Sequence, residues 1–204
     1  MHPRGASQDQ SWAPANSAVQ FRAQTTSIDV SPVTMSPSPL YVKLRSLAQI
    51  HAIPNDVEQL LSIRYPDAIH AWGHTHLVSR HSTLADRMDN TAFLAHLKST
   101  GPYLDPARGG AEVHSITVDE YERRAVVHMS YFLVPAGSEE KVEQDLIWIL
   151  KFTEGEDVEQ VQIKESVEFI DATASARVGS VIRSVHGQLT DDVRGGITLQ
   201  EGKL

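Results

Sequence analysis

Cysteine is absent from this chain of 204 residues. Its absence excludes a disulfide framework, thiol catalysis and thiolate metal sites. Basic residues are scarce, with 18 lysines and arginines against 26 aspartates and glutamates, and the formal net charge of −8 argues against non-specific nucleic-acid binding. No apolar run approaches the roughly 18–20 residues that a membrane-spanning helix needs, and the N-terminal residues lack the apolar stretch of a secretory signal. We therefore expect no nucleic-acid or membrane partner, and a cytoplasmic location by default.

Motifs for cofactors and for serine hydrolysis are also missing. Gly109-Gly110 and Gly195-Gly196 are isolated pairs, and neither forms a glycine-rich phosphate loop after a strand. No G-x-S-x-G nucleophile elbow is present. Histidine is frequent, but His74-Thr75-His76 and His81 lie outside any firm helix or strand, and no HExxH or 2-His-1-carboxylate spacing occurs. The sequence therefore predicts a protein with no metal and no cofactor.

The composition, 41% hydrophobic and 22% charged, is ordinary for one globular domain with tails. Residues 1–37 are polar and end in Ser-Pro repeats, which predicts a disordered N-terminal extension. Their scarcity of acidic residues also fits a transit peptide, which we treat as the minor alternative. We expect the domain to span residues 38–186 and a polar C-terminal tail to span residues 187–204.

The hydrophobic pattern predicts helices first and strands later in the chain. Helices are expected from Leu40 to Ala48, from Val57 to Ile63, from Asn90 to Gly101 and from Thr173 to Val185, and strands over 68–72, 111–118, 123–134 and 142–152 and from Gln160 onward. Residues 74–89 are expected to be irregular. Because the later strands are joined by hairpin-sized loops, we expect them to pair antiparallel in sequence order. Helices on one side of a curved antiparallel sheet make an α+β cone that encloses an apolar cavity.

Three segments carry a family resemblance. Tyr65–Trp72 resembles the first-strand signature of the NTF2-like superfamily, and Ser166–Asp171 resembles its terminal E-(aromatic)-x-D strand ending. With Phe152–Gly155 as the preceding hairpin, their order is similar to that of SnoaL-like polyketide cyclases and their fungal tailoring relatives. The limonene-epoxide-hydrolase branch has a similar layout. Over about residues 40–185 the resemblance implies the NTF2-like cone, and a homodimer formed through the convex face of the sheet.

Two carboxylates lie inside the last strand. Side chains alternate along a strand, so Glu165 and Glu168 should face opposite ways unless a bulge intervenes. By the resemblance, Glu168 faces the cavity, where burial would raise its pKa and suit it to proton transfer. The alternatives are a solvent-facing or salt-bridged Glu168, or Glu165 in its place. Asp171 is expected to cap the last helix.

The resemblance implies further site residues. His70 and Trp72 share one face of the first strand, and by the resemblance that face points inward. His70 is then either an acid/base partner of Glu168 or a core histidine, and Tyr131 is a donor to a substrate oxygen. Substrate contacts are expected from Trp72, Trp148, Met129 and His74. The outward-facing Phe132, His128 and Asp145 are expected at the dimer interface.

Two functions remain open at this point. The first is a cofactor-free tailoring enzyme of secondary metabolism, which would catalyse acid/base cyclisation, isomerisation or dehydration of a small hydrophobic polyketide- or terpenoid-like molecule. Glu168, His70 and Tyr131 would be its catalytic residues. The second is a non-catalytic cone that binds a ligand or dimerises. It would have a filled interior and would leave both Glu165 and Glu168 in solvent.

Overall fold

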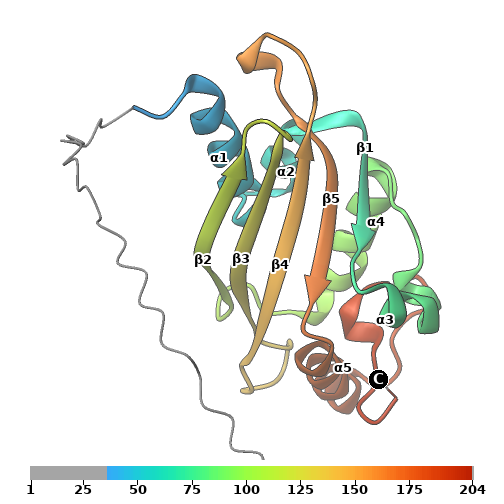
Figure 1. The fold of residues 1–204 in the computed structure, drawn as a ribbon. Coiled ribbons are helices and arrows are strands. Elements are labelled where there is room, and N and C mark those ends of the chain that lie inside the picture. Colours follow the sequence, from blue (N-terminus) through green and yellow to red (C-terminus); the bar gives the residue numbers. More distant parts are fainter. Residues whose placement is uncertain (1–35, 204) are drawn as a thin grey trace, which may run out of the picture. The chain divides into compact units, whose positions relative to one another are not determined.

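The computed structural model describes residues 36–203. The predicted disordered extension falls almost entirely on residues outside that range. The described residues form a packed unit of their own. It contains one sheet with helices on one side of it (Figure 1). No helix within residues 36–203 combines the length and the apolar character needed to cross a bilayer.

The sheet has five strands in the spatial order β1-β5-β4-β3-β2. Their bounds are Arg64–Trp72 for β1, Gly110–Asp119 for β2, Arg124–Leu133 for β3, Val142–Phe152 for β4 and Ile163–Ile170 for β5. Strands β2 to β5 pair antiparallel in sequence order, which confirms that prediction. The strand β1 pairs parallel to β5, so the sheet is not antiparallel throughout. The position of β1 could not be predicted from loop lengths, because no short loop joins it to its neighbour β5.

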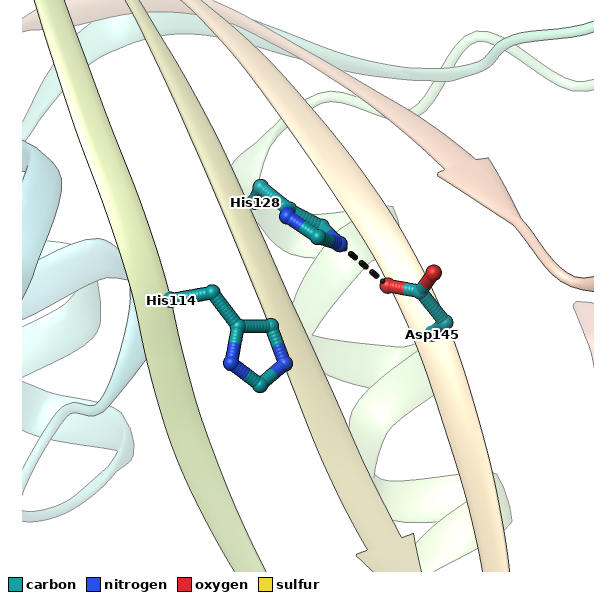
Figure 2. Close-up of side chains that lie close together, drawn as sticks. All are labelled: His114, His128 and Asp145. Carbon is teal, nitrogen blue, oxygen red and sulfur yellow. Dashed lines mark hydrogen bonds and ion pairs between the residues drawn. The ribbon is translucent and has the colours of Figure 1, made fainter.

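The two faces of the sheet differ in what covers them. The inner face is packed against α1 (Pro39–Ala52), α2 (Val57–Ser62) and α4 (Asn90–Thr100). The opposite, outer face carries polar side chains, among them His114, His128 and Asp145 (Figure 2). Side chains on β3 and β4 alternate between the faces as expected, so Trp148 points inward while His128 and Asp145 point outward.

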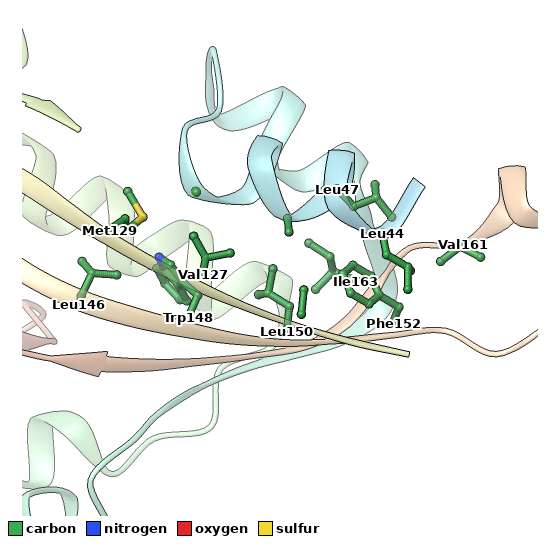
Figure 3. Packing of buried hydrophobic residues seen from close by; sticks show 13 residues of the cluster. Leu44, Leu47, Val127, Met129, Leu146, Trp148, Leu150, Phe152, Val161 and Ile163 are labelled. Atoms are coloured by element: carbon green, nitrogen blue, oxygen red, sulfur yellow. The ribbon is translucent and has the colours of Figure 1, made fainter. Parts of the chain in front are cut away.

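The main core lies between α1 and the sheet (Figure 3). Ser38 begins α1, because its Oγ accepts a hydrogen bond from the Tyr41 backbone N–H at 2.9 Å. Leu44 and Leu47 then face Val127, Leu150 and Ile163 of the sheet, and all five side chains are buried. Burial of such a side chain contributes about 1.5–3 kcal/mol. This layer fills one end of the cone and leaves the other end for the cavity.

The C-terminal segment differs from its expected form. The helix α5 (Ala172–His186) begins at Asp171, whose carboxylate accepts hydrogen bonds from the Thr173 and Ala174 N–H groups at 2.8 and 3.0 Å, the cap expected of it. After α5 the chain does not leave the fold as a polar tail. Three of its apolar side chains, Val193, Ile197 and Leu199, are buried. They are spaced among polar residues, so the sequence gives no periodic signal for them.

The stretch expected to be irregular, residues 74–89, contains the short helix α3 (Thr75–Arg80). His74 precedes it with φ of 57°, in the left-handed region. A side chain is strained there, and the adjacent glycine, Gly73, does not occupy the left-handed position itself. Because no glycine stands at position 74, the sequence pattern did not indicate that the helix α3 begins there.

Candidate active site

A cavity of about 600 Å³ lies between the inner face of the sheet and the helices. Its wall is mainly apolar and aromatic, and Trp72, Phe93, Trp148 and Ile170 belong to it. Pockets of this size and character hold small organic ligands. Within this wall, Glu168 is the carboxylate with the least exposure to solvent, because Asp56 and Asp105 lie at exposed or half-exposed positions.

A bulge decides which carboxylate of β5 faces the cavity. The pairing of β5 shifts register next to Ile163, against both β4 and β1. Strict alternation from Ile163 would have placed Glu165 inside. Because of the shift, Ile163 shares the inner face with Ser166, Glu168 and Ile170. Glu165 lies on the outer face, where it makes ion pairs with Arg87 at 3.1 Å and Lys151 at 2.9 Å.

The environment of Glu168 favours its neutral form. Its side chain is 12% exposed, and no lysine or arginine among the described residues pairs with it. Burial raises the pKa of Glu168 to about 8. A carboxyl group with this pKa is mostly protonated at neutral pH and can both give and take a proton in that range.

Behind Glu168 lies a chain of polar contacts that ends at a buried cation. Arg64, which is 3% exposed, donates from Nη1 to Ser166 Oγ at 3.0 Å. The same oxygen lies 3.2 Å from His70 Nδ1, and His70 Nε2 lies 3.8 Å from Glu168 Oε2. Arg64 can only donate, so the Ser166 hydroxyl is free to donate to Nδ1. That assignment places the imidazole proton on Nε2, facing Glu168.

His70, the histidine in this series of polar contacts, is neutral. His70 is fully buried, and its ring stacks on Phe93 with a centroid separation of 4.5 Å. Burial lowers the pKa of His70 well below its usual value, and the charges of His51, His96 and Arg64 lower it further. At neutral pH its Nε2–H is therefore a hydrogen-bond donor and not a second charge beside Glu168.

Several buried polar atoms in the cavity wall have no partner within residues 36–203. They are the indole nitrogens of Trp72 and Trp148, both ring nitrogens of His51, and Nδ1 of His96. An unpaired buried polar group costs about 1–3 kcal/mol. Burial lowers the pKa of His51 to about 3 and that of His96 to about 4, so both rings are neutral near pH 7. The wall thus offers uncharged hydrogen-bonding groups to a ligand.

Comparison with protein-family models gives no match, and comparison with curated protein sequences gives none either. Solved structures do match. PrhC from Penicillium brasilianum NBRC 6234 aligns with a TM-score of 0.58 at 15% identity, over 72% of this chain and 93% of PrhC. BvnE pinacolase from Penicillium brevicompactum aligns with a TM-score of 0.57 at 14% identity, over 73% of this chain and 99% of BvnE.

A third match is a candidate SnoaL-like polyketide cyclase from Jannaschia sp. CCS1. It has a TM-score of 0.53 at 11% identity, over 76% of this chain and 99% of that chain. The chain has the NTF2-like fold. This confirms the fold class predicted from the sequence. Structural matches at identities this low show the fold alone, so the reaction of this chain has to be argued from its site.

The NTF2-like cone brings together part of the predicted site. Glu168, Trp72, Trp148 and Tyr131 all line the cavity. His70 is not part of the cavity wall and lies behind Glu168. The Tyr131 hydroxyl donates to the Ala52 carbonyl at 3.2 Å, so its proton already has an acceptor. Burial raises the pKa of Tyr131, and the charge of Glu168 raises it further, so it is neutral at physiological pH.

Two predicted substrate contacts are not in the cavity wall. Met129 is fully buried in the main core with α1. Met129 does point to the inner face of the sheet, as predicted. That face lines the cavity at one end and packs against α1 at the other, and Met129 lies in the part that packs against α1. His74 lies beyond the cavity and makes an edge-on contact with the Phe169 ring, with centroids 4.9 Å apart. Phe169 is on the outer face, because the bulge in β5 also reverses its direction.

His51 and His96 are cavity residues that the sequence did not reveal. His51 ends the inward side of α1 and contacts the Trp148 ring edge-on, with centroids 4.6 Å apart. His96 lies on α4 and contacts Trp72 in the same manner at 5.5 Å. A helical spacing signal was available, since His51 follows Leu44, Leu47 and Ala48 on the buried side. For His96 the signal is Phe93, three residues earlier on the same helix.

Proposed function

We propose that this chain is a cofactor-free enzyme that moves protons on a small hydrophobic molecule of polyketide- or terpenoid-like character. The reaction class is cyclisation, isomerisation or dehydration. The observation that carries the proposal is Glu168, a buried carboxyl group with a raised pKa in the wall of an apolar cavity. The NTF2-like folds of a pinacolase and of a candidate polyketide cyclase support the choice of class.

In this proposal Glu168 is the catalytic acid and base. In its protonated form it donates to an oxygen of the substrate, and in its ionised form it removes a proton from carbon. The Nε2–H of His70, 3.8 Å away, stabilises the carboxylate as it forms. Ser166 and Arg64 hold the His70 tautomer that makes this donation possible. His70, Ser166 and Arg64 are therefore positioning residues.

The substrate oxygen is held by the uncharged donors of the wall. The indole N–H groups of Trp72 and Trp148 lack protein partners within the described chain, so binding an oxygen atom would satisfy them. The same two rings form flat walls for a ring system. Tyr131 would take part only if it released its bond to Ala52, so it is the weakest of the three predicted catalytic residues.

Elimination of 5-nitrobenzisoxazole tests the proposal without knowledge of the natural substrate. This flat, apolar bicycle loses its C3 proton to a base while its N–O bond breaks, and the cyanophenolate product absorbs visible light. We expect the chain to accelerate the elimination above buffer, with a rate that rises as pH approaches 8 and Glu168 ionises. A rate equal to that of buffer at every pH would contradict a reactive carboxylate in the cavity.

The non-catalytic alternative has less support. It expects both carboxylates of β5 in solvent and a filled interior, whereas the Glu168 side chain is 12% exposed and the cone holds a cavity of about 600 Å³. A carrier that binds without catalysis would take up the benzisoxazole without eliminating it. Equilibrium dialysis of the compound against the inactive variant described below separates binding from turnover.

The predicted homodimer remains a prediction. In its favour, Val126 and Ile147 on the outer face are 37% and 40% exposed, near the predicted contacts His128 and Asp145. Two exposed apolar side chains on one sheet face would be covered in such a dimer. Gel filtration at micromolar concentration should give the mass of two chains, and replacing Ile147 by lysine should shift it to one. A single-chain mass for the unaltered protein would contradict the dimer.

A further inference from the structure

The outer face of the sheet holds a compact group of side chains that the proposed function does not use. His114 of β2, His128 of β3 and Asp145 of β4 point toward one another (Figure 2). One nitrogen or oxygen atom from each lies within 4.8 Å of the others. The sheet separates this group from the cavity, because the cavity is lined by residues of the inner face.

Strand register assembles the three side chains. A bulge between Val113 and Ser115 lets His114 project from the outer face beside His128, whose direct partner on β2 is Ser115. Asp145 lies opposite Ser130, two residues from His128 and on the same face. Three neighbouring strands thus present two imidazoles and one carboxylate in a row.

The contacts within the group fix both rings. His128 Nε2 lies 2.7 Å from Asp145 Oδ1, and His114 Nε2 lies 2.9 Å from Ser130 Oγ. Ser130, which is 1% exposed, donates onward to Glu143 Oε1 at 2.8 Å. These hydrogen bonds hold the Nε2 atoms of both rings on the same side as the Asp145 carboxylate.

The local charge favours a cation. Glu112 lies beside His114, with Oε1 3.9 Å from Nδ1, so three carboxylates surround two imidazoles. Among the ion pairs formed within residues 36–203, none joins Glu112, Glu143 or Asp145 to a lysine or arginine. The patch therefore holds three carboxylates that form no ion pair with a lysine or arginine of the described residues, which favours a cation.

We propose that His114, His128 and Asp145 form a binding site for a divalent transition metal of the zinc type. Two imidazole nitrogens with one carboxylate suit zinc, and magnesium or calcium would prefer oxygen ligands alone. Metal–ligand bonds of about 2.0–2.2 Å need ligand atoms roughly 3.3–3.5 Å apart. Small side-chain rotations at this half-exposed face close the present separation. The remaining coordination positions point away from the sheet.

In this site the metal takes the position that the Nε2 proton of His128 occupies in its hydrogen bond to Asp145. The metal takes His128 Nε2 in its neutral form, and the imidazole proton moves to Nδ1. Glu112 is placed to accept from Nδ1 of His114 when Nε2 of that ring binds the metal. The bound ion would join β2, β3 and β4 and so stabilise the sheet by mass action.

Zinc titration of the full chain by isothermal calorimetry tests the site, after removal of metal with a chelator. We expect one Zn²⁺ per chain and an increase in the melting temperature. His114→Ala, His128→Ala and Asp145→Asn should each lower the zinc affinity at least tenfold. His186→Ala is the matched control, because that histidine is exposed on α5, where it contacts the Ala136 carbonyl and the Tyr103 ring and none of the three proposed ligands.

The variants also separate this proposal from the proposed function. Residues of the outer face do not touch the cavity, so all three variants should retain the benzisoxazole activity of the unaltered chain. Circular dichroism confirms that each variant is folded. The site is refuted if zinc binds without saturating at one ion per chain, or if the three variants bind zinc as tightly as the His186→Ala control does.

Discussion

Replacing Glu168 by glutamine should lower the rate of benzisoxazole elimination by about 10²–10⁴-fold, the usual contribution of a positioned base. Glutamine keeps the size and polarity of the side chain but cannot take the proton. Burial holds the pKa of Glu168 at about 8, so the unaltered chain should show a rate that rises with pH and levels off above that value. The rise should be missing from the Glu168→Gln variant.

The neighbouring carboxylate supplies the matched control. Glu165 lies three residues away on the same strand, but the bulge turns it outward to Arg87 and Lys151. Glu165→Gln makes the same chemical change, a carboxyl group to an amide, without changing the cavity. It should therefore retain the rate and its pH profile. Equal losses in the two variants would show that net charge, and not a base in the cavity, governs the reaction.

Acid should unfold the protein well above the pH at which ordinary globular domains unfold. His51, His70 and His96 are held neutral by burial, with pKa values of about 3 for His51 and about 4 for His96 and a strong lowering for His70. In the unfolded chain each takes up a proton near pH 6.5. Above pH 6.5 these histidines are neutral in both states and their contribution to the stability of the fold is complete. As pH falls below 6.5, the unfolded chain binds protons that the folded chain does not, so this stability is lost.

The size of this effect follows from the linkage between protons and folding. One extra proton bound by the unfolded chain removes about 1.4 kcal/mol of stability per pH unit. Three such histidines remove up to about 4 kcal/mol per unit, which exhausts a typical stability of roughly 5–15 kcal/mol within about two to three units. Glu168 has the opposite sign. Its pKa is raised, so its contribution is full below pH 4.5 and is lost as pH rises through about 8.

Urea unfolding at a series of pH values measures these contributions. Stability should be greatest slightly above pH 6.5, because the histidines lower it below that pH and Glu168, ionised in the unfolded chain but protonated in the folded one, lowers it from there up to about pH 8. His96→Gln removes one of the three histidines, so the deficit of this variant relative to the unaltered chain should shrink as pH falls. A constant difference at every pH would contradict a buried neutral His96. His186→Gln, on the exposed side of α5, is the comparison.

The fold could be predicted because its signals are local. Alternating apolar residues, capping residues such as Asp171 and short loops determine the helices and the β2 to β5 meander. The parallel pairing of β1 with β5 and the packing of Val193 and Ile197 are not local, since each joins segments far apart in sequence. No periodic pattern within either segment records such a contact.

The site was harder to predict, because two single-residue irregularities decide it. The bulge beside Ile163 reverses the faces of all later residues of β5, which turns Glu168 inward and Phe169 outward. Without the resemblance, alternation alone would have favoured Glu165. The second bulge, at His114, assembles the outer histidines from three strands, so no motif spacing exists for a sequence to display.

The pKa of Glu168 is the quantity on which the proposed function depends most directly. It can be measured by carbon-13 NMR of the side-chain carboxyl groups, in protein labelled at glutamate, with the Glu168→Gln variant used to assign the signal. We expect one carboxyl group to titrate near pH 8 and to be missing from the variant. If the Glu168 signal titrates near pH 4.5 like an exposed glutamate, the proton-transfer role proposed for it is wrong.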